Sequence, residues 1–105
     1  MIPVSRTVGT DRLVDEFVLH FTHTTTIDWM LHGIAQTGRP VQVPMVAIVQ
    51  FQAGKLVHEH IYRDQASVLV QIGLLDAASL PVTGADQARK VIDKLLPSNM
   101  LMPDP

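Results

Sequence analysis

The sequence contains no cysteine, few charged residues and no long apolar run, and each shortage excludes a class of protein. Without cysteine the chain has neither a disulfide framework nor thiolate chemistry, which fits a reducing compartment. The longest uninterrupted apolar run, Met45 to Val49, is far too short to cross a bilayer, and residues 1–10 lack the pattern of a secretory signal. We therefore expect a soluble, cytoplasmic protein that does not interact with membranes.

Charge is scarce, and the charges present are evenly spread. Charged residues make up 17% of the 105 residues, the net charge is -2, and the eight Lys and Arg residues form no basic stripe, which argues against nucleic-acid binding. A hydrophobic fraction of 47% is too high for a disordered chain and leaves apolar surface for a partner. We expect one domain over residues 1–96, a proline-rich tail over residues 97–105, and assembly as a homodimer or higher homo-oligomer.

Alternation of apolar and polar residues with a period of two predicts four strands. The expected strands cover residues 2–8, 12–24, 41–51 and 56–64. Every second residue from Val41 to Phe51 is apolar, so this face of the third strand is expected to lie in the core. Ala53 and Gly54 separate the last two strands, which is the spacing of a tight antiparallel hairpin with a positive φ at the glycine.

Two segments with apolar residues at helical spacing follow the strands in the sequence. Asp64 is a suitable N-cap for a helix over residues 65–75, which Gly73 would end. Its expected apolar stripe consists of Ala66, Leu69, Ile72 and Leu75. A second helix is expected over residues 85–96, with an inner face of Ala88, Val91, Ile92, Leu95 and Leu96. Residues 28–38 indicate a loop or a single helical turn that carries Trp29. Strands first and helices last predict an α+β fold with an antiparallel sheet covered on one side.

Four short motifs stand in a characteristic order: Thr37-Gly38 before a long strand, Gly54-Lys55 in the hairpin, Asp64 at the end of the return strand, and Gln71-Ile72-Gly73 in the helix. Together with DEFVLHFTHT, which contains His23, this order resembles the SnoaL-like polyketide cyclases of the nuclear transport factor two-like superfamily, over residues 4–75.

The resemblance implies a cone-like curved antiparallel sheet of the cystatin-like α+β barrel type, wrapped around a pocket. Family members include ring-closing enzymes, isomerases, hydrolases and proteins without known activity. The family's fold begins with helices that close the pocket. This chain starts at its first strand, so we expect these N-terminal lid helices to be missing. Arg63 also stands where related sequences carry a tryptophan, which would change the outer face of its strand.

Alternation places His58, His60, Tyr62 and Asp64 on one face of the last strand. In the functional interpretation, Asp64 is the acid/base of a pocket for a small, mainly apolar carbonyl compound, and His60 and Tyr62 assist it. His58, His23 and Trp29 are the further candidates for ligand binding. In the structural interpretation, His60 and Tyr62 are partly buried and hydrogen-bonded, and Asp64 only caps its helix. A cap stabilises the carboxylate and makes it a weaker base.

A metal site built from His58, His60 and Asp64 is a third hypothesis, but no second histidine-bearing motif follows Ile61, so we predict neither a metal nor another cofactor. Two functions remain open at this point. One is a small-molecule-binding domain with cyclase or isomerase chemistry. The other is a non-enzymatic domain for oligomerisation or for carrying a ligand.

Overall fold

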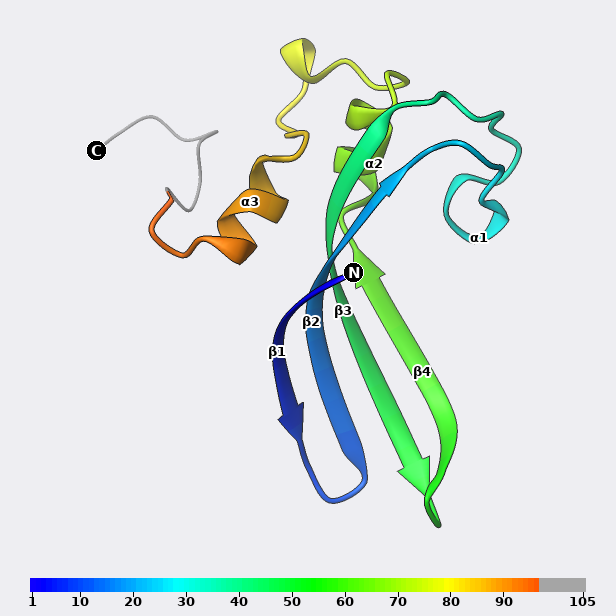
Figure 1. The fold of residues 1–105 in the computed structure, drawn as a ribbon, viewed down its shortest axis with the longest axis vertical. Coiled ribbons are helices and arrows are strands. Elements are labelled where there is room, and N and C mark those ends of the chain that lie inside the picture. Colours follow the sequence, from blue (N-terminus) through cyan, green and yellow to red (C-terminus); the bar gives the residue numbers. More distant parts are fainter. Residues whose placement is uncertain (97–105) are drawn as a thin grey trace.

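The computed structural model describes residues 1–96 and consists of a four-stranded antiparallel sheet with its helices gathered at one end (Figure 1). The elements are β1 (Ile2–Val8), β2 (Arg12–Thr22), α1 (Asp28–Leu31), β3 (Pro40–Gln52), β4 (Lys55–Arg63), α2 (Gln65–Gln71), the 3-10 helix η1 (Ala77–Ser79) and α3 (Asp86–Ile92). Each strand pairs with the next one in the sequence, so the sheet is a simple meander. All four expected strands are confirmed, with ends within about two residues. The expected tail lies outside the described residues.

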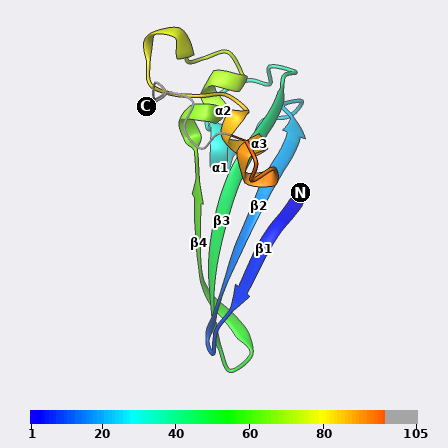
Figure 2. The same cartoon turned by 90° about the vertical axis from the view of Figure 1, so that its left-hand side faces the viewer.

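The sheet extends well beyond the helices. Its upper end carries α1, α2 and α3, whereas the hairpins β1–β2 and β3–β4 project away from them at the lower end (Figures 1 and 2). Ala53 and Gly54 form the tip of the second hairpin with φ values of 52° and 75°. Positive φ at both central residues matches the right-handed twist of the flanking strands. Among residues 1–96, no helix is long and apolar enough to cross a membrane.

The core lies between the upper sheet and the helices α1 and α2. Val41, Val43 and Met45 of β3 are almost completely buried, as the alternation predicted. They pack in one cluster with Met30 and Leu31 of α1. Partly buried residues of β2 and the loops complete the cluster: Phe17, Leu19, Phe21, Ile27 and Ile34. Each fully buried aliphatic side chain contributes about 1.5–3 kcal/mol, so this cluster holds the helical end together.

Helix α2 is shorter than expected and uses a different stripe. It ends at Gln71 because Gly73 has a φ of 87°, and the bonds Gly73 N–Val70 O (3.1 Å) and Leu74 N–Leu69 O (2.9 Å) form a Schellman motif. The buried pair is Val68 and Ile72, four residues apart, whereas Ala66 and Leu75 of the expected stripe are only half-buried. The prediction missed Val68 because its stripe followed a spacing of three residues, whereas the buried pair is spaced by four.

Helix α3 corrects two further expectations. It covers Asp86–Ile92 only, so Leu95 and Leu96 lie beyond its end and are exposed, and Ile92 is exposed as well. Ala88 is its buried contact residue. The helix packs on the sheet face opposite the core of α1 and α2, where Val18 is completely buried. The sheet is therefore covered on both sides at its upper end, whereas the sequence predicted cover on one side.

Candidate functional site

The predicted polar line of β4 lies on the sheet face opposite the α1–α2 core. The strand register aligns side chains in three rows across β2, β3 and β4: Arg12–Gln50–His58, Val14–Ile48–His60 and Glu16–Val46–Tyr62. Directly paired residues of an antiparallel sheet point to the same side. The shared face of His58, His60 and Tyr62 is thus confirmed, and it is the same face that carries α3 higher up.

Asp64 caps helix α2, as expected. Its Oδ1 accepts a hydrogen bond from Ser67 N at 3.1 Å, and the Ser67 hydroxyl donates to the Asp64 carbonyl oxygen at 2.9 Å. The residue is half-buried. Its second carboxylate oxygen, Oδ2, forms no hydrogen bond within residues 1–96, so one oxygen can still reach a ligand.

Tyr62 and Asp64 line one hollow, whereas His60 lines another. The first, which we call the Tyr62–Asp64 hollow, measures about 350 Å³ and is mainly apolar. Its walls are Glu16, Pro44, Met45, Val46, Tyr62, Arg63, Asp64 and Val91. The second, the histidine hollow, measures about 210 Å³ and is lined by Arg12, Ile48, Gln50, His58 and His60. The three predicted catalytic residues are therefore divided between two neighbouring hollows.

The structural interpretation of His60 and Tyr62 is wrong in one respect. Both side chains are exposed, Tyr62 by 59%, and neither makes a side-chain hydrogen bond within residues 1–96. The expectation assumed that their face would be covered. On this face α3 packs mainly on β2 and β3, whereas β4 is the strand at the other edge of the sheet and its side chains stay exposed (Figure 1).

His23 lies elsewhere and closes a loop. Its ring is completely buried and its Nδ1 accepts a hydrogen bond from Thr37 N at 3.1 Å. The backbone bonds His23 N–Arg39 O (2.9 Å) and Gly38 N–His23 O (2.8 Å) hold the same two segments together. Because Nδ1 is an acceptor, the neutral ring carries its proton on Nε2, which has no partner among the described residues. This geometry accounts for His23 as a loop clasp, and its ligand-binding role stays a prediction.

Trp29 and Arg63 form a bridge between α1 and the start of α2. The Trp29 side chain is mostly exposed, and the Arg63 guanidinium lies 5.5 Å from the centre of its ring. Arg63 Nε donates to Gln65 Oε1 at 2.8 Å, and Gln65 Nε2 donates to Met30 O at 2.8 Å. Arg63 pairs with the core residue Met45, so it lies on the face of the sheet that α1 and α2 cover and not on the face of His60 and Tyr62. Trp29 and His58 therefore lie on opposite faces of the sheet.

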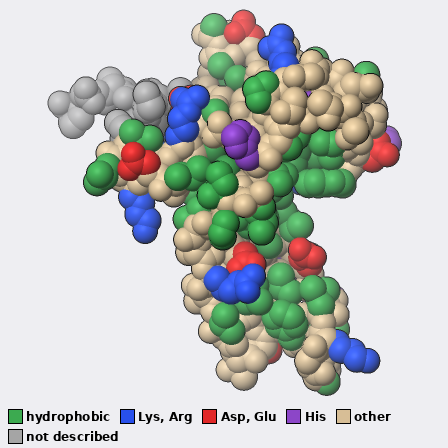
Figure 3. Space-filling view, in the orientation of Figure 1, with side chains coloured by type: hydrophobic (Ala, Val, Ile, Leu, Met, Phe, Trp, Pro, Cys, Tyr) green, Lys and Arg blue, Asp and Glu red, His purple; other side chains and the backbone are tan. Residues whose placement is uncertain are grey.

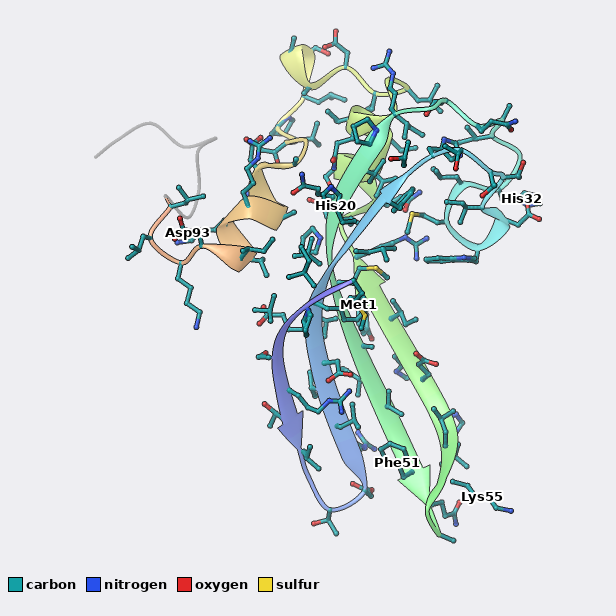
Figure 4. The ribbon with its side chains drawn as sticks, viewed as in Figure 1. Met1, His20, His32, Phe51, Lys55 and Asp93 are labelled. Carbon is teal, nitrogen blue, oxygen red and sulfur yellow. The ribbon has the colours of Figure 1, made fainter. Side chains whose placement is uncertain are left out.

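The histidines do not gather into one centre. His20 lies near the helices and His32 lies on the far side of α1 (Figure 4). Within residues 1–96, no group of three His, Cys, Asp or Glu side chains is close enough to hold a metal ion.

The sequence identifies Gln71 only as part of the Gln71-Ile72-Gly73 motif and does not indicate its role in packing. Gln71 Oε1 accepts from Gln42 N at 2.8 Å, and Gln71 Nε2 donates to Gln42 O at 2.9 Å and to Ser67 O at 3.0 Å. The side-chain amide thus replaces a neighbouring strand where β3 continues past the end of β4. It fixes α2, and with it Asp64, against the sheet.

Comparison with known proteins gives structural matches only. No protein-family model and no curated protein sequence matches the chain. A protein from Jannaschia sp. CCS1 assigned as a SnoaL-like polyketide cyclase has a TM-score of 0.61 at 20% identity, covering 71% of this chain and 49% of its own. TsrD from Streptomyces laurentii has a TM-score of 0.60 at 21% identity, covering 68% of this chain and 50% of its own.

A third solved structure agrees with these two. AclR from Streptomyces galilaeus, assigned as a hydroxylase, has a TM-score of 0.57 at 25% identity, covering 69% of this chain and 45% of its own. The chain spans about half of the length of each of the three proteins. Its curved four-stranded sheet and short helices are therefore the fold of the SnoaL-like proteins in the nuclear transport factor two-like superfamily.

Proposed function

We propose that this chain is a small-molecule-binding domain that holds a mainly apolar carbonyl compound in the Tyr62–Asp64 hollow. The observation that carries the proposal is the combination, in one hollow, of a mainly apolar lining with the Tyr62 hydroxyl and the Asp64 carboxylate, and Glu16 and Arg63 are the other charged residues of its wall. Binding sites for small molecules typically have this composition, with few polar groups that fix the orientation of the ligand. One structural neighbour is assigned as a SnoaL-like polyketide cyclase.

The proposed chemistry is proton transfer next to a carbonyl group. The Tyr62 hydroxyl donates a hydrogen bond to the carbonyl oxygen, and the free Oδ2 of Asp64 accepts a proton from the adjacent carbon. The electron pair of the broken C–H bond moves into the enolate that Tyr62 stabilises. The cap bond from Ser67 N engages Oδ1, so Oδ2 is the oxygen of Asp64 that is left for the ligand.

Binding is tested by NMR titration of the labelled protein with 1-tetralone, an aromatic ketone. The proposal expects the largest amide shifts at Val46, Tyr62 and Val91, which surround the hollow. Shifts confined to residues around Trp29, on the opposite face, would rule out the Tyr62–Asp64 hollow as the binding site. The Tyr62→Phe variant should weaken binding because it removes the donor to the carbonyl oxygen.

Catalysis is tested separately, by exchange of the α-protons of 1-tetralone in D2O. Asparagine caps helices as well as aspartate does, so Asp64→Asn removes the base while keeping the fold. Exchange should fall by a factor of about 10² or more. The matched control is Asp76→Asn, because Asp76 caps η1 through Ala78 N at 2.9 Å and lies outside the hollow. Equal exchange by Asp64→Asn and wild type would refute the base, even if ligand binding persists.

A second candidate function is assembly of copies of the chain through the lower sheet. Hydrophobic side chains are exposed on the lower sheet (Figure 3), and those on the face opposite the histidine hollow are Val8, Leu56 and Ile61. Exposed apolar patches on a sheet mark surfaces that associate. Native mass spectrometry should show a dimer that Ile61→Lys dissociates, whereas Leu80→Lys, at a similarly exposed residue outside the sheet, leaves it intact. A wild-type chain that is monomeric throughout a concentration series would exclude this function.

A further inference from the structure

The histidine hollow has the composition of an anion site, which the proposed function does not use. Its row Arg12–Gln50–His58 brings one side chain from each of β2, β3 and β4 to the same level of the sheet. His60 stands in the next row, and all these side chains line one hollow of about 210 Å³. Guanidinium, amide and imidazole groups all carry N–H donors, and no carboxylate lines the hollow.

The donors of this hollow are available. Within residues 1–96, the side chains of Arg12, His58 and His60 form no ion pair and no hydrogen bond to another side chain or to the backbone. In contrast, Arg6 on β1 is fully engaged: its Nε and Nη2 bind the two oxygens of Asp15 at 2.6 and 2.8 Å. Arg12 is thus the arginine of the sheet whose planar fork is open to a ligand.

The charges around the hollow favour an anion. Lys55 is paired with Gln52 on the same face of the sheet, below the row of His58, and lies at the hairpin tip (Figure 4). The acidic residues toward this face are Asp64, at the far end of β4, and Glu16, two rows above Arg12, where it accepts a hydrogen bond from the Ser5 hydroxyl at 3.0 Å. Glu59 belongs to the opposite face of β4, because it pairs with Val49.

An apolar strip adjoins the donors. The next row contains Val14 and Ile48 beside His60, and Ile48 is itself part of the hollow. A ligand that places its charged group on Arg12 and His58 can lay an apolar group over Ile48 and Val14. Contact with this strip removes apolar surface from water and adds to the attraction of the charge.

We propose that the histidine hollow binds a small oxyanion, a carboxylate or a phosphate monoester, that carries an apolar group. Arg12 forms a bidentate contact with two anion oxygens, Gln50 and His58 donate further hydrogen bonds, and the apolar group lies on Ile48 and Val14. The site is independent of the Tyr62–Asp64 hollow and of any chemistry there.

The test is an NMR titration of the whole chain with phenyl phosphate, benzoate, inorganic phosphate and the neutral benzamide. Phenyl phosphate and benzoate should shift the amides of Arg12, Gln50 and His58 and compete with each other. Inorganic phosphate should bind more weakly because it lacks the apolar group, and benzamide should not shift these amides. Raising the salt concentration from about 0.02 M to about 0.5 M should weaken the binding of the anions, because salt screens exposed charges.

Two variants localise the effect. Arg12→Gln should lower the affinity for phenyl phosphate about tenfold, which is the loss expected for one charge-assisted contact. Arg89→Gln is the matched control, because Arg89 is an exposed arginine on α3, away from the hollow, and its removal should leave the affinity unchanged.

Two results would overturn the proposal. One is an affinity of Arg12→Gln for phenyl phosphate equal to that of the wild type. The other is a shift of the same amides by benzamide and benzoate to the same extent, which would show that the surface selects the ring and not the charge.

Discussion

Gln71 holds helix α2 against the open edge of β3 through hydrogen bonds of its side-chain amide. Removing this amide should lower the free energy of unfolding considerably, although it removes no apolar contact. The informative change is Gln71→Met, which keeps the length of the side chain and removes its amide. It deletes both bonds to the Gln42 backbone, at 2.8 and 2.9 Å, and the bond to Ser67 O. Hydrogen bonds contribute about 0.5–1.5 kcal/mol each. Because Gln42 is half-buried and loses both partners, we expect a loss of about 2–3 kcal/mol.

The measurement is urea denaturation followed by circular dichroism. A loss of this size should lower the thermal midpoint by roughly 10–20 °C in a domain of this length, and the urea dependence should keep its slope. Amide exchange at Gln42 gives a local reading and should become fast. The control is Gln52→Met at the exposed end of β3, where no side-chain hydrogen bond is lost within residues 1–96. A loss below about 0.5 kcal/mol for Gln71→Met would show that water replaces the amide and would refute the reasoning.

Three further predictions concern the cap, the strongest ion pair and the hairpin. Asp64→Ala should lower the free energy of unfolding by about 1 kcal/mol, whereas Asp64→Asn should change it by a few tenths, as measured by thermal denaturation; equal losses would contradict the cap. The hydrogen bond from Arg6 lowers the pKa of Asp15, so the pair stabilises the fold above the unfolded pKa of the carboxyl and is lost as the pH falls through its folded value. Asp15→Asn should therefore flatten the decrease of the urea midpoint between about pH 5 and about pH 2, and an unchanged decrease would contradict this assignment. Ala53→Gly should raise the thermal stability by about 0.5–1 kcal/mol, since alanine is strained at a φ of 52°, and a destabilised variant would show that the hairpin tolerates the strain.

The two hollows divide the polar line of β4 in a way that alternation could not reveal. Spacing places His58, His60, Tyr62 and Asp64 on one side of the strand, but the neighbours come from β2, β3 and α3. Arg12 turns the lower hollow into a cluster of N–H donors, and Pro44 and Val91 make the upper one apolar. Neither Arg12 nor Val91 carries a local signal for these roles, because both depend on strand register and on where α3 packs.

The residues that resemble the SnoaL-like proteins are explained largely by architecture. Thr37 and His23 close the loop that contains α1, Gln71 completes the edge of β3, and Gly73 ends α2 in a left-handed conformation. These roles account for the motif without any catalytic event. Asp64 is the exception, since it caps α2 through Oδ1 and also lines the Tyr62–Asp64 hollow.

Local sequence patterns are sufficient to predict the four strands, the hairpin at Ala53-Gly54, the cap at Asp64 and the buried face of β3. These features follow from local rules, namely the two-residue period of a strand, the φ of glycine and the hydrogen bonds of an N-cap. Three features become clear only from the folded chain: which face of the sheet each helix covers, which residues of α2 are buried and which polar residues share a hollow. Such choices depend on contacts between segments far apart in the chain, such as Gln42 with Gln71 and Arg12 with Gln50, and no local pattern contains them.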